Sequence, residues 1–457
     1  MHRRNKSEIV CKPTKHILFF NLFLCISLFV FSLGCAKKIS PDTKITKNLK
    51  GPFKNILIHS SNDRLGPCEP SLSINPYDTR IMVAASVLNN VYSSSDGGRT
   101  WKNSVLSSSH GVYGDPVVRY DSKGNVFYSH LANSKGKAYA SVEFLDRIVV
   151  QRSSDNGKTW TDGTFPKADH NKDHDKQWKA IHPKTGDIVM TWTEFDVYGS
   201  KEKHHTSKIL FSISRDQGAT WSDAIEISDL RGDCLDDDYT TEGAHPAFGI
   251  NGEIYVVWSF NQKIWMDVSY DGGKTWGKDV EIAQQPGGWS FDVPGIKRCN
   301  GFPVIKIDHS QKSSRGNIYI NWADQRNGVH DTDIFLIVSK DSGKTWSDVK
   351  KINDDTPGKH QFFSWMDLDQ STGNIYFVFY DRRHTQDENT DVYLAGSFDM
   401  EQTFFNVKIS DTTFKPVRGV FFGDYNDICA VNGVIRPIWT HVDGSVLSVY
   451  TAIIDLK

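Results

Sequence analysis

An eight-residue phrase recurs six times along this chain of 457 residues, at intervals of 55 to 70 residues. Each copy starts with serine and has aspartate at its third position, and five copies end in Gly-x-Thr-Trp. The copies begin at Ser94, Ser153, Ser214, Ser269, Ser339 and Ser397, and the sixth is the most divergent. A repeat of this length marks a repeated structural unit, so it constrains the fold more than any other feature.

The phrase itself predicts a tight turn. Its aspartate can accept hydrogen bonds from backbone N–H groups two residues on, and its glycine can adopt positive φ. The threonine and tryptophan that follow are typical of the start of a strand. An apolar run such as Ile334–Val338 precedes most copies, so each phrase predicts the corner of a β-hairpin. We therefore expect the six aspartates to stabilise turns rather than to take part in catalysis.

The phrase resembles the Asp box of sialidases and related β-propellers, and five full matches in one chain make the resemblance specific for fold. Asp boxes occur in enzymes and in binding proteins alike, so the resemblance implies fold more strongly than function. The length alone would suggest about three domains. The repeats instead favour one closed all-β domain over residues 51–457.

Counting strands from the repeats gives the number of blades. A propeller blade is a four-stranded antiparallel meander around a central channel. After the sixth phrase three strands remain, at Asp424–Ala430, Val434–Thr440 and Val446–Ile453, and one strand, Asn55–Ser60, precedes the first blade. Joining that strand to the last three leaves no free sheet edge at the seam. We therefore predict an all-β, seven-bladed β-propeller of four-stranded antiparallel blades, with the last blade closed by the N-terminal strand.

The N-terminus differs from the rest of the chain. A basic start precedes an apolar run at Ile17–Leu33, which predicts a secretory signal. The following Ser32-Leu33-Gly34-Cys35 resembles a bacterial lipobox, with serine in place of the usual leucine. The resemblance implies a lipoprotein signal peptide over 1–34, lipidation of Cys35, a tether over 35–50 and a place in the bacterial cell envelope, anchored to the outer membrane. An uncleaved membrane anchor is the alternative.

Charge and composition exclude several classes of function. A net charge of −2 gives no strong attraction to nucleic acid. Because zinc-ligand spacings and phosphate-binding loops are absent from the sequence, we expect no cofactor and no metal. We also expect a monomer. The acidic run Asp236-Asp237-Asp238 could bind structural calcium, although a solvated loop is favoured. The cysteines of the mature body could be buried thiols, or Cys234 could pair with Cys299.

One face of the predicted propeller collects polar residues. Strand direction alternates within a blade, so the inner-strand starts and the loops between second and third strands meet at the face opposite the turn phrases. Charged groups are costly to bury unpaired, so such a ring suggests a polar ligand. The inner-strand starts bring Glu69, Asp115, Asp175, Lys176, Glu242, His245, Arg298, Asn300, His360, Gln361, Asp424 and Tyr425. The loops bring Glu194, Asp196, Asn261, Gln262, Asp324, Arg326, Asp381, Arg382 and Arg383.

Structural roles stay open for several of these residues. Asp115 could cap neighbouring backbone. Asp324 and Asp381 stand beside arginines and could form local ion pairs. His245, which precedes a proline, could be a hydrogen-bonded structural histidine, and Tyr425 could serve packing.

The family resemblance implies two kinds of chemistry. In sialidases an arginine triad grips the sugar carboxylate, a tyrosine with a carboxylate partner is the nucleophile, and an aspartate is the acid/base. The matching candidates are Arg298, Arg326 and Arg382 or Arg383 for the triad, Tyr425 and Glu242 for the nucleophile pair, and Asp115 or Asp175 for the acid/base. Against this, the Arg-Ile-Pro signature of sialidases is absent and seven blades replace six.

Seven-bladed relatives include ulvan lyases and rhamnose–glucuronate-cleaving enzymes, which act on uronic-acid glycans. For these the resemblance implies His245 or Tyr425 as the base and arginine as the partner of the sugar carboxylate. Asn300 and Gln361 join the four arginines as expected substrate-binding residues. We therefore expect an exported enzyme that cleaves acidic glycans by hydrolysis or β-elimination. A non-catalytic surface propeller that binds glycans is the alternative.

Overall fold

The computed structural model describes residues 49, 51–63, 65–133, 145–385 and 387–456. The predicted signal peptide, Cys35 and nearly all of the predicted tether lie outside the described residues. The strands described below belong to the unit formed by residues 41–457. No helix in the described ranges is long and apolar enough to cross a membrane.

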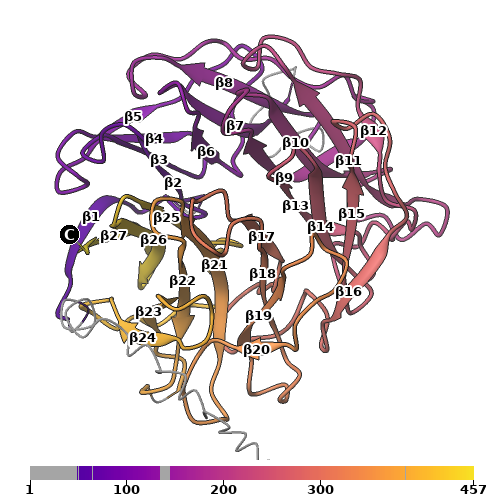
Figure 1. The fold of residues 1–457 in the computed structure, drawn as a ribbon. Helices are drawn as coiled ribbons and strands as arrows, with labels where there is room; N and C mark the ends of the chain where they lie inside the picture. The colour runs from indigo at the N-terminus through magenta and orange to yellow at the C-terminus, as the bar shows by residue number, and fades with distance from the viewer. Residues whose placement is uncertain (1–48, 50, 64, 134–144, 386, 457) are drawn as a thin grey trace, which may run out of the picture. The chain divides into compact units, whose positions relative to one another are not determined.

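The described chain forms seven antiparallel sheets arranged as the blades of a propeller (Figure 1). The first blade contains β2 (Ser71–Ile74), β3 (Met82–Ser86), β4 (Asn90–Ser94) and β5 (Lys102–Val105). The second contains β6 (Val117–Tyr120), β7 (Val126–Ala132) and β8 (Arg147–Ser153). The third contains β9 (Asp173–Ile181), β10 (Ile188–Phe195), β11 (Ser207–Ser214) and β12 (Ile225–Glu226).

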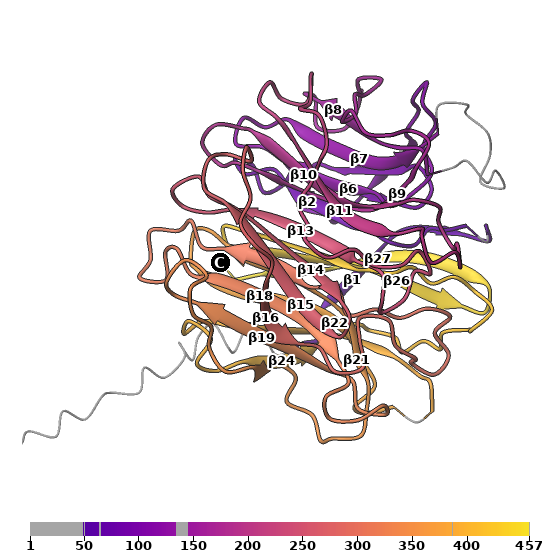
Figure 2. The same cartoon turned by 90° about the vertical axis from the view of Figure 1, so that its right-hand side faces the viewer.

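The remaining blades follow in chain order. The fourth contains β13 (Glu242–Phe248), β14 (Ile254–Phe260), β15 (Lys263–Ser269) and β16 (Val280–Gln284), of which β13, β14 and β15 lie next to one another in Figure 2. The fifth contains β17 (Val304–Ile307), β18 (Ile318–Asp324), β19 (Asp333–Ser339) and β20 (Lys350–Lys351). The sixth contains β21 (Gln361–Asp369), β22 (Asn374–Asp381), β23 (Asp391–Ser397) and β24 (Phe405–Lys408). The seventh contains β25 (Asp427–Val431), β26 (Val434–Asp443), β27 (Val446–Asp455) and β1 (Lys54–Ser61).

The seam of the propeller confirms the strand count. The N-terminal strand β1 pairs antiparallel with β27, from Lys54 opposite Ile453 to Ser61 opposite Leu447. The seventh blade therefore joins the two ends of the described chain, as the sequence predicted. The second blade is the one departure from four strands among the described residues. There Thr164 pairs with Val150 of β8 in a single antiparallel bridge, in place of a fourth strand.

The repeated phrases form the turns between third and fourth strands. In the first copy, Oδ1 of Asp96 accepts the N–H of Thr100 at 2.9 Å and Oδ2 accepts its hydroxyl at 2.7 Å. The hydroxyl oxygen of Ser94 accepts the N–H of Gly98 at 2.9 Å. Both carboxylate oxygens of the aspartate thus accept hydrogen bonds within the turn. The turn lies at the end of the blade opposite the start of the inner strand.

The divergent sixth copy keeps the same bonds. Asp399 accepts the N–H and the hydroxyl of Thr403 at 2.9 and 2.7 Å, and Ser397 accepts the N–H of Glu401 at 2.9 Å. Glu401 stands where the other copies have glycine and adopts φ of 61°, and Met400 before it adopts 55°. The serine, aspartate and threonine therefore suffice to form the turn.

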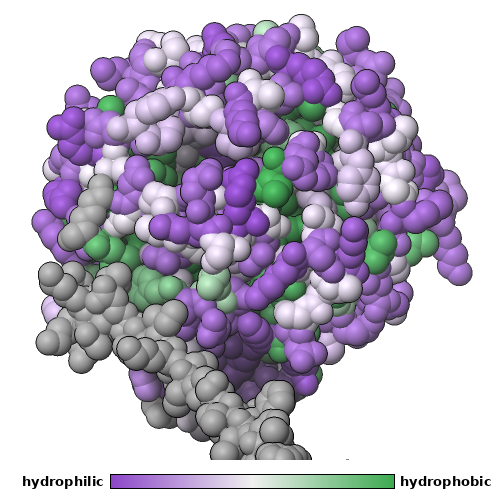
Figure 3. All heavy atoms as spheres, in the orientation of Figure 1, coloured by the Kyte–Doolittle hydropathy of each residue, from purple (hydrophilic) through white to green (hydrophobic). Residues whose placement is uncertain are grey.

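The core lies within and between blades. Its largest fully buried side chains include one tryptophan from the second strand of four blades, Trp192, Trp258, Trp322 and Trp439. The face seen in Figure 3 is largely hydrophilic, with small separated hydrophobic patches. Within the described ranges Cys68, Cys234, Cys299 and Cys429 are free thiols, so Cys234 and Cys299 are not paired and the thiol alternative holds.

Candidate functional site

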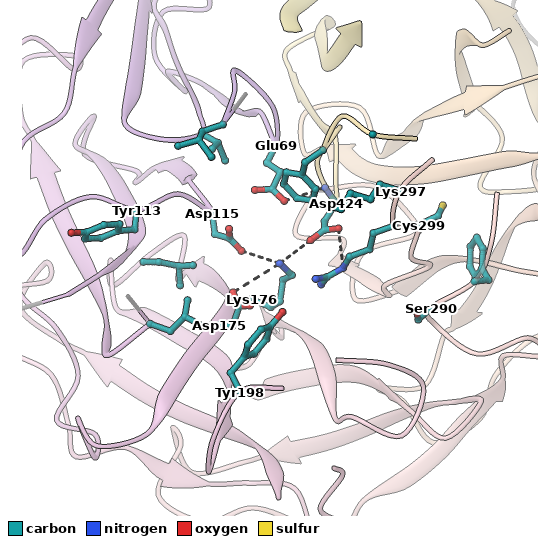
Figure 4. Close-up of a pocket in the computed structure, with 18 of the residues that line it drawn as sticks. Glu69, Tyr113, Asp115, Asp175, Lys176, Tyr198, Ser290, Lys297, Cys299 and Asp424 are labelled. Atoms are coloured by element: carbon teal, nitrogen blue, oxygen red, sulfur yellow. Dashed lines mark hydrogen bonds and ion pairs between the residues drawn. The ribbon is translucent and has the colours of Figure 1, made fainter. Parts of the chain in front are cut away.

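A cavity of about 780 Å³ opens at the end of the propeller where the inner strands start. Its charged floor is assembled from several blades (Figure 4). Glu69 precedes β2, Asp115 precedes β6, Asp175 and Lys176 lie in β9, Arg298 precedes β17 and Asp424 precedes β25. Its walls include the apolar or aromatic side chains of Leu65, Val87, Tyr113, Leu131, Leu145, Phe291 and Phe421.

Unusual backbone geometry places three of these charged side chains. Glu69, Asp115 and Lys176 adopt φ of 51°, 50° and 53° at the entry to the inner strands of consecutive blades. Such a conformation costs an L-residue about 1 kcal/mol and is concentrated at functional sites. In β9 the pairing with β10 also shifts between Thr191 and Thr193, next to Lys176. A bulge of this kind re-aims a side chain, here into the cavity.

Lys176 is the centre of the first ion cluster. Its Nζ lies 2.9 Å from Oδ2 of Asp424, 3.2 Å from Oδ2 of Asp115 and 3.9 Å from Oδ1 of Asp175 (Figure 4). Burial opposes the charge on Lys176, but the three carboxylates outweigh burial and raise its pKa well above the usual value. The lysine is therefore a permanent cation shared by carboxylates of three blades.

Arg298 is the centre of the second ion cluster. Its NH1 donates to Oδ2 of Asp236 at 2.5 Å, and its Nε lies 3.2 Å from Oδ1 of Asp424. The hydroxyl of Tyr198 donates to the same Oδ2 of Asp236 at 2.5 Å. Burial, followed by Asp236 and Asp175, raises the pKa of Tyr198 well above its ordinary value. Tyr198 is thus a neutral hydrogen-bond donor at the cavity wall.

The carboxyl groups of the site have shifted pKa values of opposite sign. Burial raises the pKa of Asp175 to about 6, against the opposing charge of Lys176. Burial also acts on Asp424, but Arg298 and Lys176 outweigh it and lower the pKa of that carboxyl. Asp175 therefore keeps its proton up to a pH of about 6, whereas Asp424 stays ionised at that pH. A carboxyl whose pKa is raised in this way is a candidate proton donor.

Two glutamates lie deeper. Burial, followed by Asp115 and Asp424, raises the pKa of Glu69 well above its usual range. Glu69 accepts the N–H of Asp424 at 3.1 Å. Gly423 makes this approach possible, because its φ is 98° and a Cβ there would lie 2.9 Å from Cγ of Glu69. Glu242 is fully buried, neither of its carboxyl oxygens has a hydrogen-bond partner among the described residues, and burial raises its pKa well above its usual range.

The structure brings some of the predicted site residues together. Asp115, Asp175 and Arg298 line the cavity. Glu242 starts β13 and interacts electrostatically with Arg298, Lys176 and Asp175, but it does not line the cavity. Asn300 lies beneath the floor, where its Nδ2 donates to the backbone carbonyl of Asp424 at 2.9 Å. The catalytic and binding roles of these residues remain predictions.

His245 and Tyr425 lie elsewhere, so their predicted position at the mouth is wrong. Both rings pack against Trp178, at centroid distances of 5.6 and 5.0 Å. The hydroxyl of Tyr425 donates to the carbonyl of Pro116 at 3.2 Å. Nδ1 of His245 accepts the N–H of Ile305 at 3.1 Å, and burial holds the pKa of the imidazole well below its usual value. These are packing contacts of the central channel.

The other predicted binding residues also lie outside the cavity lining. Arg326 pairs with Asp324 at 2.6 Å, and Arg383 pairs with Asp381 at 2.8 Å, which are the local ion pairs left open above. Arg382 is buried. Arg382 donates to the hydroxyl of Thr390 at 3.1 Å and to the carbonyl of Pro294 at 2.8 Å. Gln361 bonds the side chains of Asn353 at 2.8 Å and Asp355 at 3.0 Å. Of the arginines expected to converge on the site, only Arg298 lines the cavity in the described part of the chain.

The acidic run at 236–238 is not a solvated loop, contrary to expectation. Asp236 holds Arg298 and Tyr198, and Asp238 accepts the N–H of Ser290 at 2.8 Å. Sequence reasoning missed Tyr198 and the role of Asp236 because both lie in irregular loops after the strands that defined the count.

A different acidic group comes together between the fifth and sixth blades. Carboxylate oxygens of Asp331, Asp333 and Asp355 lie within 4.8 Å of one another. Nζ of Lys351 lies 3.0 and 3.1 Å from Asp333 and Asp355 and supplies the compensating positive charge. Lys351 thus neutralises part of the negative charge of this acidic group.

Comparison with known proteins places the fold. No protein-family model and no curated protein sequence matches the chain. Among solved structures, an ulvan lyase described as a polysaccharide lyase superposes with a TM-score of 0.51 at 10% identity, covering 88% of this chain and 96% of that one. The chain thus shares the β-propeller fold with this lyase.

Two further structures resemble this propeller with lower TM-scores. The NanB sialidase from Streptococcus pneumoniae has a TM-score of 0.49 at 11% identity, covering 82% of this chain and 83% of that one. The alpha-L-arabinanase of Penicillium chrysogenum has a TM-score of 0.46 at 15% identity, covering 76% and 98%. All three structures are carbohydrate-active enzymes by name.

Proposed function

We propose that this propeller is a glycan-cleaving enzyme whose reaction takes place in the cavity around Lys176. The observation that carries the proposal is the cluster of three carboxyl groups from three blades around Lys176 on the floor of a drug-sized cavity, in which burial raises the pKa of Asp175 to about 6. The solved structures of similar fold support it, since they are enzymes acting on carbohydrates.

Asp175 and Asp115 are the proposed acid/base pair. Asp175 lines the cavity with a pKa of about 6, which suits a proton donor to a leaving glycosidic oxygen. Asp115 is the most exposed of the three carboxylates around Lys176, with 13% of its side chain accessible against 8% for Asp175 and 1% for Asp424. Asp115 is therefore the carboxylate best placed to act on the sugar or on water. Asp424, tied to both cations, positions them.

Hydrolysis fits this arrangement better than β-elimination. Elimination from a uronate needs a base that reaches the proton beside the sugar carboxylate. Two tyrosines, Tyr113 and Tyr198, line the cavity. The hydroxyl of Tyr198 already donates to Asp236, and burial raises the pKa of both tyrosines, so both are poorly suited to accept a proton. Acidic glycans remain the proposed substrate class, with Arg298 and the exposed Lys297 of the cavity lining as partners for a sugar carboxylate.

The test uses the soluble propeller and a panel of acidic and neutral polysaccharide oligomers. Hydrolysis produces new reducing ends that lack the ultraviolet absorbance at about 235 nm. Elimination produces unsaturated uronates, which absorb at about that wavelength. Asp175→Asn and Asp115→Asn should each lower kcat about 10²- to 10⁴-fold. Asp223→Asn, at a side chain that is 79% exposed on an outer part of the third blade, is the matched control.

Three outcomes decide between the alternatives. Products that absorb near 235 nm would replace hydrolysis by elimination. Binding of oligomers without any product would leave the non-catalytic propeller as the correct function. Full activity in both aspartate variants would move the reaction away from this cavity.

We also propose export and anchoring through Cys35, on the basis of the sequence alone. Cells labelled with a fatty-acid analogue should incorporate it into the full-length chain and not into the Cys35→Ala variant. Equal labelling of the two chains would contradict lipidation at this residue.

A further inference from the structure

A second cavity, of about 980 Å³, adjoins the carboxyl cavity and shares Phe291 and Asp292 with it. The two cavities also share their loops. Two loops contribute residues to both linings. One is the loop between β16 and β17, through residues in 287–299, and the other is the loop between β24 and β25, through residues in 415–421. The two hollows therefore form neighbouring parts of one surface at the same end of the propeller.

The second cavity differs from the first in chemistry. Its lining is largely apolar, with Phe291, Val293, Pro294, Val329, Pro416 and Val417. Val329 and Val417 are 66% and 43% exposed, although valine is normally buried. The faces of sugar rings are apolar and their edges are polar. An apolar wall with polar groups beside it thus suits stacked sugar rings.

Polar partners stand at the edge of this wall. Arg418 lies 3.7 Å from Asp292, with side chains 73% and 96% exposed. Lys415 lies 3.7 Å from both Asp387 and Glu388. Exposed ion pairs at such distances are weak, so these side chains can turn to the hydroxyl or carboxylate groups of a ligand at little cost.

We propose that the second cavity binds further sugar residues of the same glycan chain that is cleaved in the first. This inference rests on the proposed function and specifies its substrate as a chain of several sugars rather than a single terminal sugar. The two cavities are each of the size that encloses a drug-like molecule, which is larger than one sugar ring. When a glycan chain occupies both cavities, one of its internal bonds, and not only a terminal bond, lies over Asp175 and Asp115.

The experiment combines chain length with substitution of the exposed valines. In the wild-type protein, KM for oligomers of one polysaccharide should fall as the length rises from two to about eight residues. The double variant Val329→Asp/Val417→Asp should bind the longest oligomer about tenfold more weakly and leave the shortest unaffected. Val105→Asp/Val280→Asp is the matched control, because these valines lie on outer strands and are 68% and 51% exposed. The control should behave as wild type.

A second readout needs no turnover. Native electrophoresis in gels that contain soluble polygalacturonate, alginate, xylan or arabinan should retard the wild type in at least one gel and retard the Val329/Val417 variant less. If that holds while no gel polysaccharide is cleaved, the proposed function fails and the second cavity is still a glycan site. If turnover occurs without any gain from chain length, or if the variant is retarded as strongly as wild type, the inference about the second cavity is overturned. Failure to be retarded in every gel, together with absence of turnover, overturns both.

Discussion

Replacing Lys176 by methionine should destabilise the propeller in a way that depends on pH. The substitution keeps the length of the side chain and removes the cation, which is 5% exposed and lies between Asp115, Asp175 and Asp424. Removing one partner of a buried ion pair costs about 3–5 kcal/mol, because the remaining charges stay buried without compensation. We expect a loss of stability in that range at pH 8.

The expected change in melting temperature follows from the size of the domain. The strands run from Lys54 to Asp455, so about 400 residues unfold, and at roughly 2.1 cal/mol/K per residue the unfolding entropy is about 0.8 kcal/mol/K. A loss of about 3–5 kcal/mol then lowers Tm by about 4–6 °C. Lys278→Met is the control, since Lys278 is 87% exposed and bonds Asp229 at the surface. Its Tm should equal that of wild type.

The sign of the pH dependence separates charge from packing. Lys176 lowers the pKa of Asp175 and of Asp424 in the folded protein, so both carboxyls in the variant take up protons at higher pH. Protonation removes the repulsion between them. The pKa of Lys176 itself is raised in the folded protein. The stability that its charge contributes is therefore fully present at every pH below about 10.5, the pKa of an unperturbed lysine.

Differential scanning fluorimetry at pH 8 and pH 5 measures the effect. The difference in Tm between wild type and Lys176→Met should be largest at pH 8 and fall to less than half at pH 5. An equal difference at both pH values would mean that Lys176 acts through packing, and the electrostatic account of the cavity would be refuted.

Two further predictions concern the site and the scaffold. If Asp175 donates the proton, kcat/KM falls as pH rises through about 6, where its carboxyl loses the proton. A profile that is flat from pH 5 to pH 8 would contradict this role. In the divergent sixth turn, Met400 adopts φ of 55° at a position that is glycine in the first and fourth copies. Met400→Gly should therefore stabilise the fold by about 1 kcal/mol, seen as a rise in Tm of about 1 °C with unchanged activity, and a lower Tm would refute it.

The architecture could be predicted from the sequence because it depends on local signals that repeat. The serine, aspartate and threonine of each phrase form the same bonds in the first copy and in the sixth. Once the turns are located, strand alternation fixes the number of blades and the strand that closes the last one. The single bridge at Thr164 could not be predicted, since the loop there has ordinary turn composition.

The site could be predicted only in part. Asp115, Asp175, Arg298 and Asp424 stand at strand starts, so counting blades was enough to bring them together. Counting could not show how far along the axis a side chain reaches. Tyr425 directly follows Asp424, yet its ring points into the packed channel beside Trp178 and Trp365. Arg326 and Arg383 were misplaced because each has an aspartate two residues earlier that holds it locally.

The backbone at the strand starts explains why residue type alone was a weak guide. In a regular strand, neighbouring side chains point to opposite faces, so Asp175 and Lys176 could not both line one cavity. The positive φ of Lys176 and the register shift beside it break that alternation, and both side chains reach the same hollow. Glycine would adopt this backbone at lower cost, but it would remove the cation that holds three carboxylates. The chain thus retains a strained lysine, aspartate and glutamate at three equivalent positions. Gly243 at the start of β13 and Phe363 at the start of β21 also have positive φ, of 75° and 50°. The backbone turn is therefore a feature of several blades, and in the first three blades it carries charged side chains into the cavity.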